Sequence, residues 1–179
     1  HKIHGPKGVG ALYIRTGTKI KPLNHGGGHE FGIRSGTENI PGIVGFAKAA
    51  DVIKGSDIDH MNKLKDHMIE RIETEIDNVV FNGSREKRLC NNVNFSFKFI
   101  EGESLLLHLD MKGIEVSTGS ACSSKSLEPS HVLLALGLPH EIAHGSIRFT
   151  LSKYSTKEEI DFTIKHLKEA VSKLRKMSP

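Results

Sequence analysis

The chain has 179 residues, of which 37% are hydrophobic and 26% are charged, an ordinary composition for a globular protein. No apolar run approaches the roughly 18 residues that span a membrane, and two cysteines are too few for a disulfide framework, so we expect a reducing, cytoplasmic setting. The net charge of +4 is spread among acidic residues, so it predicts neither a membrane surface nor a direct nucleic-acid partner.

The chain begins with a glycine-punctuated turn at residues 1–10, which runs into a predicted strand at Ala11–Arg15. This turn is expected to hold Lys2 at a fixed point beside a sheet. Taken alone, a lysine next to such a turn is also typical of a solvated surface residue. Because the chain does not begin with Met, we expect it to be a piece of a longer protein.

A second glycine-rich stretch, Gly26–Gly28, is followed by several polar side chains that suit an anion. Backbone amides in glycine runs approach anions closely, and Arg34, Ser35 and Thr37 add further donors. Neither a Walker motif nor a dinucleotide-binding pattern is present. The stretch therefore predicts an anion site without identifying the ligand.

Periodic apolar residues define the remaining elements. Asn39 is expected to cap a helix that has Pro41 in its first turn and ends before Gly55. Further helices are predicted at Ile58–Asp77, Glu103–Met111, Ser130–Leu136 and Ile160–Leu174, and strands at Val79–Phe81, Val93–Phe97, Ile114–Val116 and Ile147–Leu151. A capping box is expected at Ser155–Glu158. From Ile58 onward, this order predicts a compact α/β or α+β domain.

One cysteine lies in a stretch of mostly small or hydroxylated residues, Val116–Lys125, which predicts a loop. A reactive thiol needs exposure and nearby donors or positive charge, and Ser123, Ser124 and Lys125 follow Cys122 directly. A Ser-rich surface turn with an incidental cysteine fits this stretch equally well. Cys90 precedes a strand and is expected to be structural.

The segment His140–His144 matches the zinc-protease pattern His-Glu-x-x-His. Pro139 and Gly145 confine it to about one and a half helical turns, whereas a metalloprotease places this pattern in a long helix with a third ligand downstream. We therefore interpret it as a short surface helix.

Four separated stretches together resemble the pyridoxal-phosphate-dependent cysteine desulfurases, in the order and spacing of their housekeeping iron–sulfur-cluster branch. They are His1–Gly8, Gly26–Thr37, Ser117–Ser124 and Ser146–Phe149. The resemblance covers essentially the whole chain and implies the C-terminal half of such an enzyme. It implies an α/β fold: the C-terminal part of a fold-type I transferase, with 1–57 a remnant of the cofactor-binding large domain and 58–179 a complete smaller α+β domain.

The resemblance also implies roles for individual residues. Lys2 resembles the lysine that holds pyridoxal phosphate as a Schiff base, and His1 resembles a residue of the cofactor-phosphate site. Thr37 resembles the threonine that reaches the phosphate of the neighbouring subunit's cofactor, which implies a homodimer. Arg148, expected to point off the apolar face of its strand, resembles the arginine that binds the substrate carboxylate. Cys122 resembles the nucleophile that becomes a persulfide.

The implied activity converts L-cysteine to L-alanine, and the persulfide sulfur passes to an iron–sulfur scaffold protein and other acceptors. No dedicated metal site is implied, although Cys122 is expected to ligate transiently a cluster shared with the scaffold. The alternatives are a selenocysteine lyase or another lyase of the same fold, and an inactive half-chain that serves as a scaffold-binding module. The fragment alone is expected to be inactive, because the family's other half supplies the residues that contact the cofactor ring.

Overall fold

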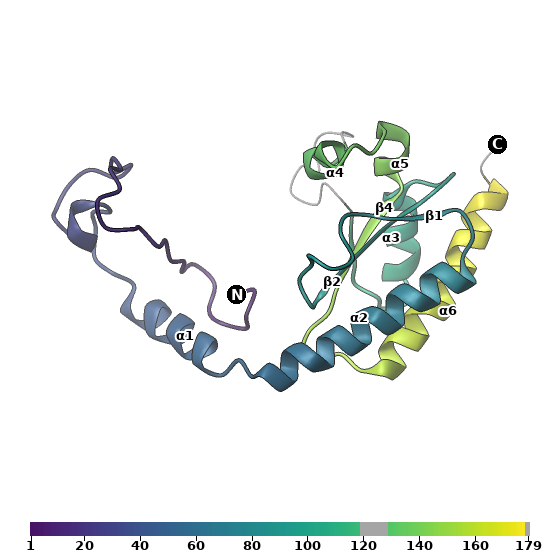
Figure 1. The fold of residues 1–179 in the computed structure, drawn as a ribbon, viewed down its shortest axis with the longest axis horizontal. Coiled ribbons are helices and arrows are strands. Elements are labelled where there is room, and N and C mark those ends of the chain that lie inside the picture. Colours follow the sequence, from purple (N-terminus) through teal and green to yellow (C-terminus); the bar gives the residue numbers. More distant parts are fainter. Residues whose placement is uncertain (119–128, 178–179) are drawn as a thin grey trace. The chain divides into compact units, whose positions relative to one another are not determined.

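The computed structural model describes residues 1–118 and 129–177 of the chain (Figure 1). The chain divides into two compact units, His1–Lys54 and Gly55–Pro179. Among the described residues, the hydrophobic core lies entirely within the second unit.

The second unit is a four-stranded antiparallel sheet with helices packed against it. Its elements are α2 (Gly55–Glu75), β1 (Val79–Phe81), β2 (Asn92–Phe97), α3 (Gly102–Asp110), β3 (Ser117–Thr118), α4 (His131–Ala135), α5 (His140–His144), β4 (Ser146–Thr150) and α6 (Lys157–Met177). The strands pair in the order β1–β2–β4–β3. This arrangement confirms the expected mixed α/β class.

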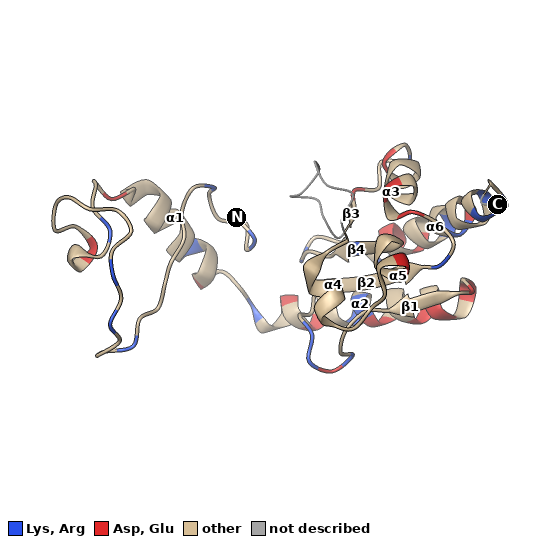
Figure 2. Ribbon diagram, turned by 90° about the horizontal axis from the view of Figure 1, so that it is seen from above, with Lys and Arg blue, Asp and Glu red and all other residues tan. Residues whose placement is uncertain are grey.

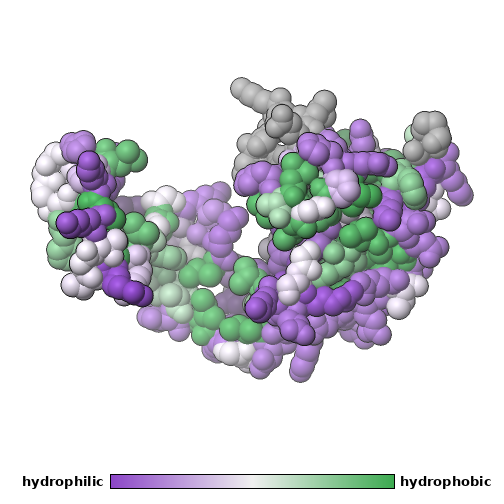
Figure 3. Space-filling model, turned by 45° about the horizontal axis from the view of Figure 1, so that its top comes forward, coloured by the Kyte–Doolittle hydropathy of each residue, from purple (hydrophilic) through white to green (hydrophobic). Residues whose placement is uncertain are grey.

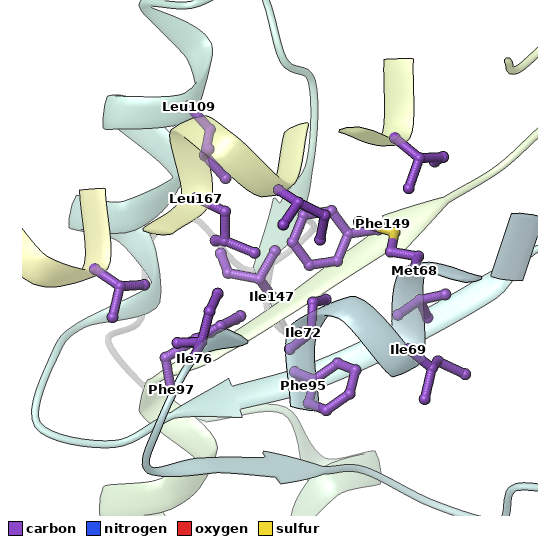
Figure 4. Packing of buried hydrophobic residues seen from close by; sticks show 14 of the residues in the cluster. Met68, Ile69, Ile72, Ile76, Phe95, Phe97, Leu109, Ile147, Phe149 and Leu167 are labelled. Atoms are coloured by element: carbon purple, nitrogen blue, oxygen red, sulfur yellow. The ribbon is translucent and has the colours of Figure 1, made fainter. Parts of the chain in front are cut away.

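The core lies between one face of the sheet and the helices α2, α3 and α6 (Figures 1 and 4). Alternate residues of each central strand enter it, because successive side chains of a strand point to opposite faces. Val93, Phe95 and Phe97 of β2 and Ile147 and Phe149 of β4 are almost completely buried. The helices contribute Met68, Ile69 and Ile72 from α2, Leu109 from α3 and Leu167 from α6, and Ile76 joins them from the residue after α2 (Figure 4). The opposite face of the sheet is therefore left to polar residues.

A glycine allows the start of α3 to pack directly against the chain that enters β4. A Cβ atom added at Gly102 would lie 2.6 Å from the carbonyl oxygen of Ser146, closer than real Cβ atoms approach. At the same junction the Phe97 amide donates to the carbonyl oxygen of Gly145 over 2.8 Å. These contacts fix where β4 begins, and hence the register of the residues on it.

Charged side chains join α2 and α6 on their outer surface. Arg71 binds Glu75 and also donates to Asp161 over 2.6 Å, and Lys168 donates to Glu75 over 2.6 Å. The pKa of Glu75 is lowered to about 2, chiefly because Arg71 hydrogen-bonds its carboxylate. Basic residues also gather at the C-terminal end of α6, where their positive charge interacts favourably with the negative end of the helix dipole (Figure 2).

The first unit contains a short 3-10 helix, η1 (Glu30–Gly32), and the helix α1 (Ile40–Asp51). The Asn39 side chain accepts from the Gly42 amide over 3.1 Å, which confirms Asn39 as the helix cap. Only Gly42 and Ala49 are buried within residues 1–54. Large apolar side chains are instead exposed, including Tyr13 at 85%, Leu23 at 92% and Phe31 at 98%. Hydrophobic patches are accordingly visible on the surface of this unit (Figure 3). This unit has no core of its own.

Three predictions of local structure were wrong in detail. Ala11–Arg15 forms no strand, because no described segment pairs with it. The strand expected at Ile114–Val116 begins later, at Ser117, because pairing with β4 decides where it starts. The capping box is one residue further along: the Glu159 amide donates to Thr156 Oγ1 over 3.2 Å, and the Thr156 amide donates to the Glu159 carboxylate over 2.8 Å.

Candidate functional site

Lys2 lies in the middle of a tight turn. The His4 amide donates to the carbonyl oxygen of His1 over 3.2 Å, which makes Lys2 and Ile3 the two central residues of a β-turn. The side chains of His1 and Lys2 are exposed. Within the part of the chain that the structure describes, Lys2 makes no hydrogen bond or ion pair. Its amine is therefore available to a ligand.

Small residues of α1 hold the chain that follows this turn. A Cβ atom added at Gly5 would lie 3.2 Å from the Ala49 Cβ atom, and one added at Gly45 would lie 3.0 Å from Pro6. Gly5 and Pro6 therefore pack directly on the helix. This contact explains the glycine and proline after the lysine, because a larger residue at position 5 would push the turn away from α1.

The loop before α1 is stabilised by side chains from the stretch in which an anion site was predicted. Arg34 Nη1 donates to the carbonyl oxygens of Gly36 and Thr37 over 3.1 and 3.4 Å. The Gly36 amide donates to His29 Nδ1 over 3.3 Å, and Ser35 Oγ donates to the carbonyl oxygen of Asn24 over 3.3 Å. Arg34 and Ser35 therefore stabilise the loop backbone, while the exposed Arg34 guanidinium keeps its remaining N–H groups.

Thr37 is one of the exposed residues of this loop. Its carbonyl oxygen is bound by Arg34, whereas its hydroxyl makes no hydrogen bond with the residues that the structure describes. Gly36 has a φ of +103°, a conformation that favours glycine, and a Cβ atom there would lie 3.2 Å from Arg34 Nη1. The loop thus leaves one hydroxyl, that of Thr37, available to an anion.

Arg148 lies on the sheet face opposite α2, α3 and α6. It is in β4, the strand between β2 and β3, and it is exposed although Ile147 and Phe149 on either side are buried. The expected direction of its side chain, off the apolar face, is therefore found in the structure. Directly across the strands, Asn94 of β2 and Ser117 of β3 are its partners in register. These three polar residues form a row across the sheet.

A buried amide holds one end of this row. Asn82, only 2% exposed, donates through Nδ2 to Asn94 Oδ1 over 2.6 Å and to Ser96 Oγ over 2.9 Å. Arg88 binds the carbonyl oxygen of Asn82 and stacks on the Phe81 ring at 4.4 Å, and burial lowers its pKa. A place for Asn94 and Asn82 in this site could not be predicted from the sequence, because it depends on the pairing of β2 with β4.

Cys122 lies outside the described residues, four positions after the end of β3 at Thr118. Cys90, which is described, is half-buried and has a free thiol. The His140–His144 segment forms the five-residue helix α5, which confirms the short helix expected there. Within residues 1–118 and 129–177, no three His, Cys, Asp or Glu side chains are grouped to hold a metal ion.

Comparisons with known proteins place these features in one family. The Aminotransferase class-V family matches residues 1–162. Cysteine desulfurase IscS of Dictyoglomus turgidum is 56% identical over 182 residues, which cover 100% of this chain and 46% of that protein. Cysteine desulfurase IscS 1 of Archaeoglobus fulgidus is 51% identical over 180 residues, which cover 99% of this chain and 47% of that protein.

Among solved structures, a NifS-like protein matches with a TM-score of 0.82 and 42% identity, over 97% of this chain and 45% of that one. The chain therefore spans about half the length of the curated relatives it matches. No helix in the described residues is both long and apolar enough to cross a membrane.

Proposed function

Because the chain belongs to the aminotransferase class-V family, we propose that it is the C-terminal half of a pyridoxal-phosphate-dependent cysteine desulfurase. The enzyme removes sulfur from L-cysteine, releases L-alanine and keeps the sulfur as a persulfide on Cys122. The units at residues 1–54 and 55–179 then correspond to the end of a large cofactor domain and to a complete small domain.

The observation that carries this proposal is the position of Arg148. An exposed guanidinium at the centre of a polar sheet face suits a bidentate contact with the carboxylate of an amino acid. Its partner in register, Ser117, is five positions before Cys122 in the sequence. Five residues extend over at most about 18 Å, so the covalent chain ties the cysteine to the neighbourhood of the arginine.

The residues of the first unit fit the phosphate and aldehyde of pyridoxal phosphate. Lys2 offers an exposed amine on a turn anchored by Gly5 and Pro6, and Thr37 offers a hydroxyl on a loop held by Arg34. Lys2 would hold the cofactor aldehyde, while His1 and Thr37 would contact phosphate. Thr37 would serve the cofactor of the neighbouring subunit, which makes the enzyme a homodimer with shared sites.

The bound cofactor would act as an electron sink for the substrate carbon skeleton. Arg148 binds the substrate carboxylate and so orients the amino acid. The Lys2 amine removes the proton from the substrate Cα atom and returns a proton to the product. The Cys122 thiolate attacks the substrate sulfur: an S–S bond forms, the C–S bond breaks, and its electron pair stays with the substrate Cβ atom, which takes up one proton to become the methyl group of L-alanine.

The persulfide sulfur then leaves for an iron–sulfur scaffold protein or another acceptor, and Cys122 transiently ligates a cluster shared with that scaffold. We place the enzyme in the cytoplasm, because a thiol that cycles through a persulfide needs a reducing compartment. A selenocysteine lyase would share Lys2 and Arg148 but not the need for Cys122. Cys122 therefore distinguishes the two enzymes.

The proposal is tested with a chimera that joins the N-terminal half of the Dictyoglomus turgidum relative to this chain, loaded with pyridoxal phosphate. After incubation with L-cysteine, intact-mass and peptide analysis should find one added sulfur atom on Cys122 and an equal amount of L-alanine. Alanine without sulfur on Cys122 in the wild-type chimera, or equal turnover by Cys122→Ser, would contradict the proposal.

A further inference from the structure

We propose that Asn94 is a second substrate-binding residue, whose side-chain amide donates to the same carboxylate that Arg148 binds. This inference rests on the proposed function, because it requires an amino-acid substrate on the outer face of the sheet. It concerns a residue on a neighbouring strand that carries no charge and lies outside the four stretches that resemble the cysteine desulfurases.

The register of the sheet places Asn94 beside Arg148. The two residues are directly opposite one another in the antiparallel pair of β2 and β4. Residues opposite one another in such a pair share a face and have Cβ atoms about 4.5–5.5 Å apart. Val93 and Phe95, the neighbours of Asn94 on β2, are completely buried on the other face. Asn94 therefore lies on the polar face with Arg148.

The contacts of Asn94 determine which of its polar atoms is available. Its Oδ1 accepts from Asn82 Nδ2 over 2.6 Å, and Asn82 itself is buried and bound to Ser96 Oγ over 2.9 Å. An asparagine has one acceptor oxygen and one amide nitrogen with two N–H groups. No described residue accepts from Nδ2 of Asn94. The side chain thus keeps its oxygen on the protein and has donors left for a ligand.

A neutral donor next to an arginine suits a carboxylate in particular. The carboxylate has two oxygens and about four lone-pair sites, and a bidentate guanidinium leaves some of them unsatisfied. An amide N–H satisfies one of these sites without adding a second positive charge. The buried hydrogen bond from Asn82 orients this amide in advance, which lowers the entropy lost when substrate binds.

Two variants separate substrate binding from a purely structural role. Asn94→Asp retains an oxygen that accepts from Asn82, but it replaces the N–H donors with a negatively charged oxygen beside the carboxylate. Asn94→Ala removes the donor and the structural acceptor together. The matched control is Asn92→Asp, which adds the same charge on the same strand face, opposite Thr150 instead of Arg148, and keeps an oxygen for Arg88.

The measurement is calorimetric binding of two ligands to the chimera loaded with pyridoxal phosphate. L-Alanine carries the carboxylate, whereas L-alaninamide has the same skeleton without that charge. The loss of one hydrogen bond to a charged group weakens binding about ten- to hundredfold. We expect Asn94→Ala to weaken the binding of L-alanine by this factor and Asn94→Asp to weaken it further. The affinity of both variants for L-alaninamide, and the affinity of the Asn92→Asp control for L-alanine, should change by less than about threefold.

The control Arg148→Ala makes the failure of the inference distinguishable from the failure of the proposed function. One outcome is that Arg148→Ala selectively weakens the binding of L-alanine, while Asn94→Asp binds both ligands like the wild type. In that case the proposed role of Asn94 is wrong and that of Arg148 stands. If Arg148→Ala does not affect L-alanine, the proposed function itself is contradicted at this site. Equal losses of both ligands in Asn94→Asp would also overturn the inference, since they indicate a structural effect. Should Asn94→Ala fail to fold, Asn94→Asp alone decides between these outcomes.

Discussion

Arg148 of β4 lies directly opposite Ser117 of β3, and β3 ends one residue later at Thr118. The strand that pairs with the arginine is therefore the strand that leads into the cysteine segment. The pairing is a property of the second unit alone. If the proposed function is correct, this pairing connects carboxylate binding and sulfur transfer through a short length of chain.

The first prediction concerns the geometry of the Arg148 contact. A lysine retains the positive charge but loses the planar pair of donors, so Arg148→Lys should lower kcat/KM for L-cysteine about tenfold or more, mainly through KM. Steady-state kinetics of the chimera measure this. Arg85→Lys is the control, because Arg85 lies on an exposed loop, where it binds Glu73 of α2. Equal kinetics of Arg148→Lys and wild type would argue against a bidentate contact.

A second prediction separates the two cysteines. Cys122→Ser should retain the bound cofactor and its absorbance but release no sulfide from L-cysteine, because the thiolate nucleophile is gone. Cys90 is half-buried and precedes β2 by two positions, so Cys90→Ala should leave sulfide release nearly unchanged. The assignment of the nucleophile would be wrong if the Cys90 variant were the inactive one.

The third prediction concerns the zinc-like motif. α5 is five residues long and is followed directly by β4, which leaves no long helix for a metalloprotease site. His140→Ala should therefore leave desulfurase activity unchanged, and metal analysis should find no stoichiometric zinc. One equivalent of zinc that disappears in His140→Ala would refute this interpretation.

A fourth prediction concerns stability in acid. Glu75 has a pKa of about 2 instead of 4.5, so its ionised form stabilises the fold above about pH 4.5, and this contribution is lost as the pH falls towards 2. The side chain is 24% exposed, and solvent screening limits the contribution. Glu75→Gln should lower the free energy of unfolding by about 1 kcal/mol at pH 7.

Urea unfolding of the 179-residue chain at a series of pH values checks this. The difference between wild type and Glu75→Gln should shrink below pH 4.5 and vanish near pH 2. Glu70→Gln on the same helix is the control, because Glu70 makes no side-chain ion pair within the described part of the chain. A difference that does not depend on pH would show that ionisation of Glu75 is not the cause.

Local patterns predicted most elements of the second unit. Alternation of Val93, Phe95 and Phe97 identified β2 and its buried face, because the side chains of a strand alternate whatever its neighbours are. The recurrence of apolar residues at three- and four-residue spacing likewise identified the helices α2 and α6. The prediction of a strand at Ala11–Arg15 was wrong, because a strand forms only when another segment pairs with it, and none of the described segments pairs with these residues.

The candidate site was less accessible from the sequence. Lys2, Thr37 and Arg148 were named from motifs, and their roles stay predictions. Arg34 was predicted as an anion donor; its Nη1 also binds the backbone at Gly36 and Thr37, and its role toward an anion stays a prediction. The position of Asn94 beside Arg148 depends on strand register, and no local pattern encodes the pairing of segments that lie more than fifty residues apart.

The central claim is that these 179 residues supply one half of a cysteine desulfurase and need the other half for turnover. The most direct test measures L-alanine formed from L-cysteine and pyridoxal phosphate by this chain alone, by the N-terminal half of the Dictyoglomus turgidum relative alone, and by the chimera of the two. We predict steady alanine formation by the chimera only. Steady alanine formation by the isolated chain at the chimera's rate, or none by a folded chimera that binds the cofactor, would contradict the claim.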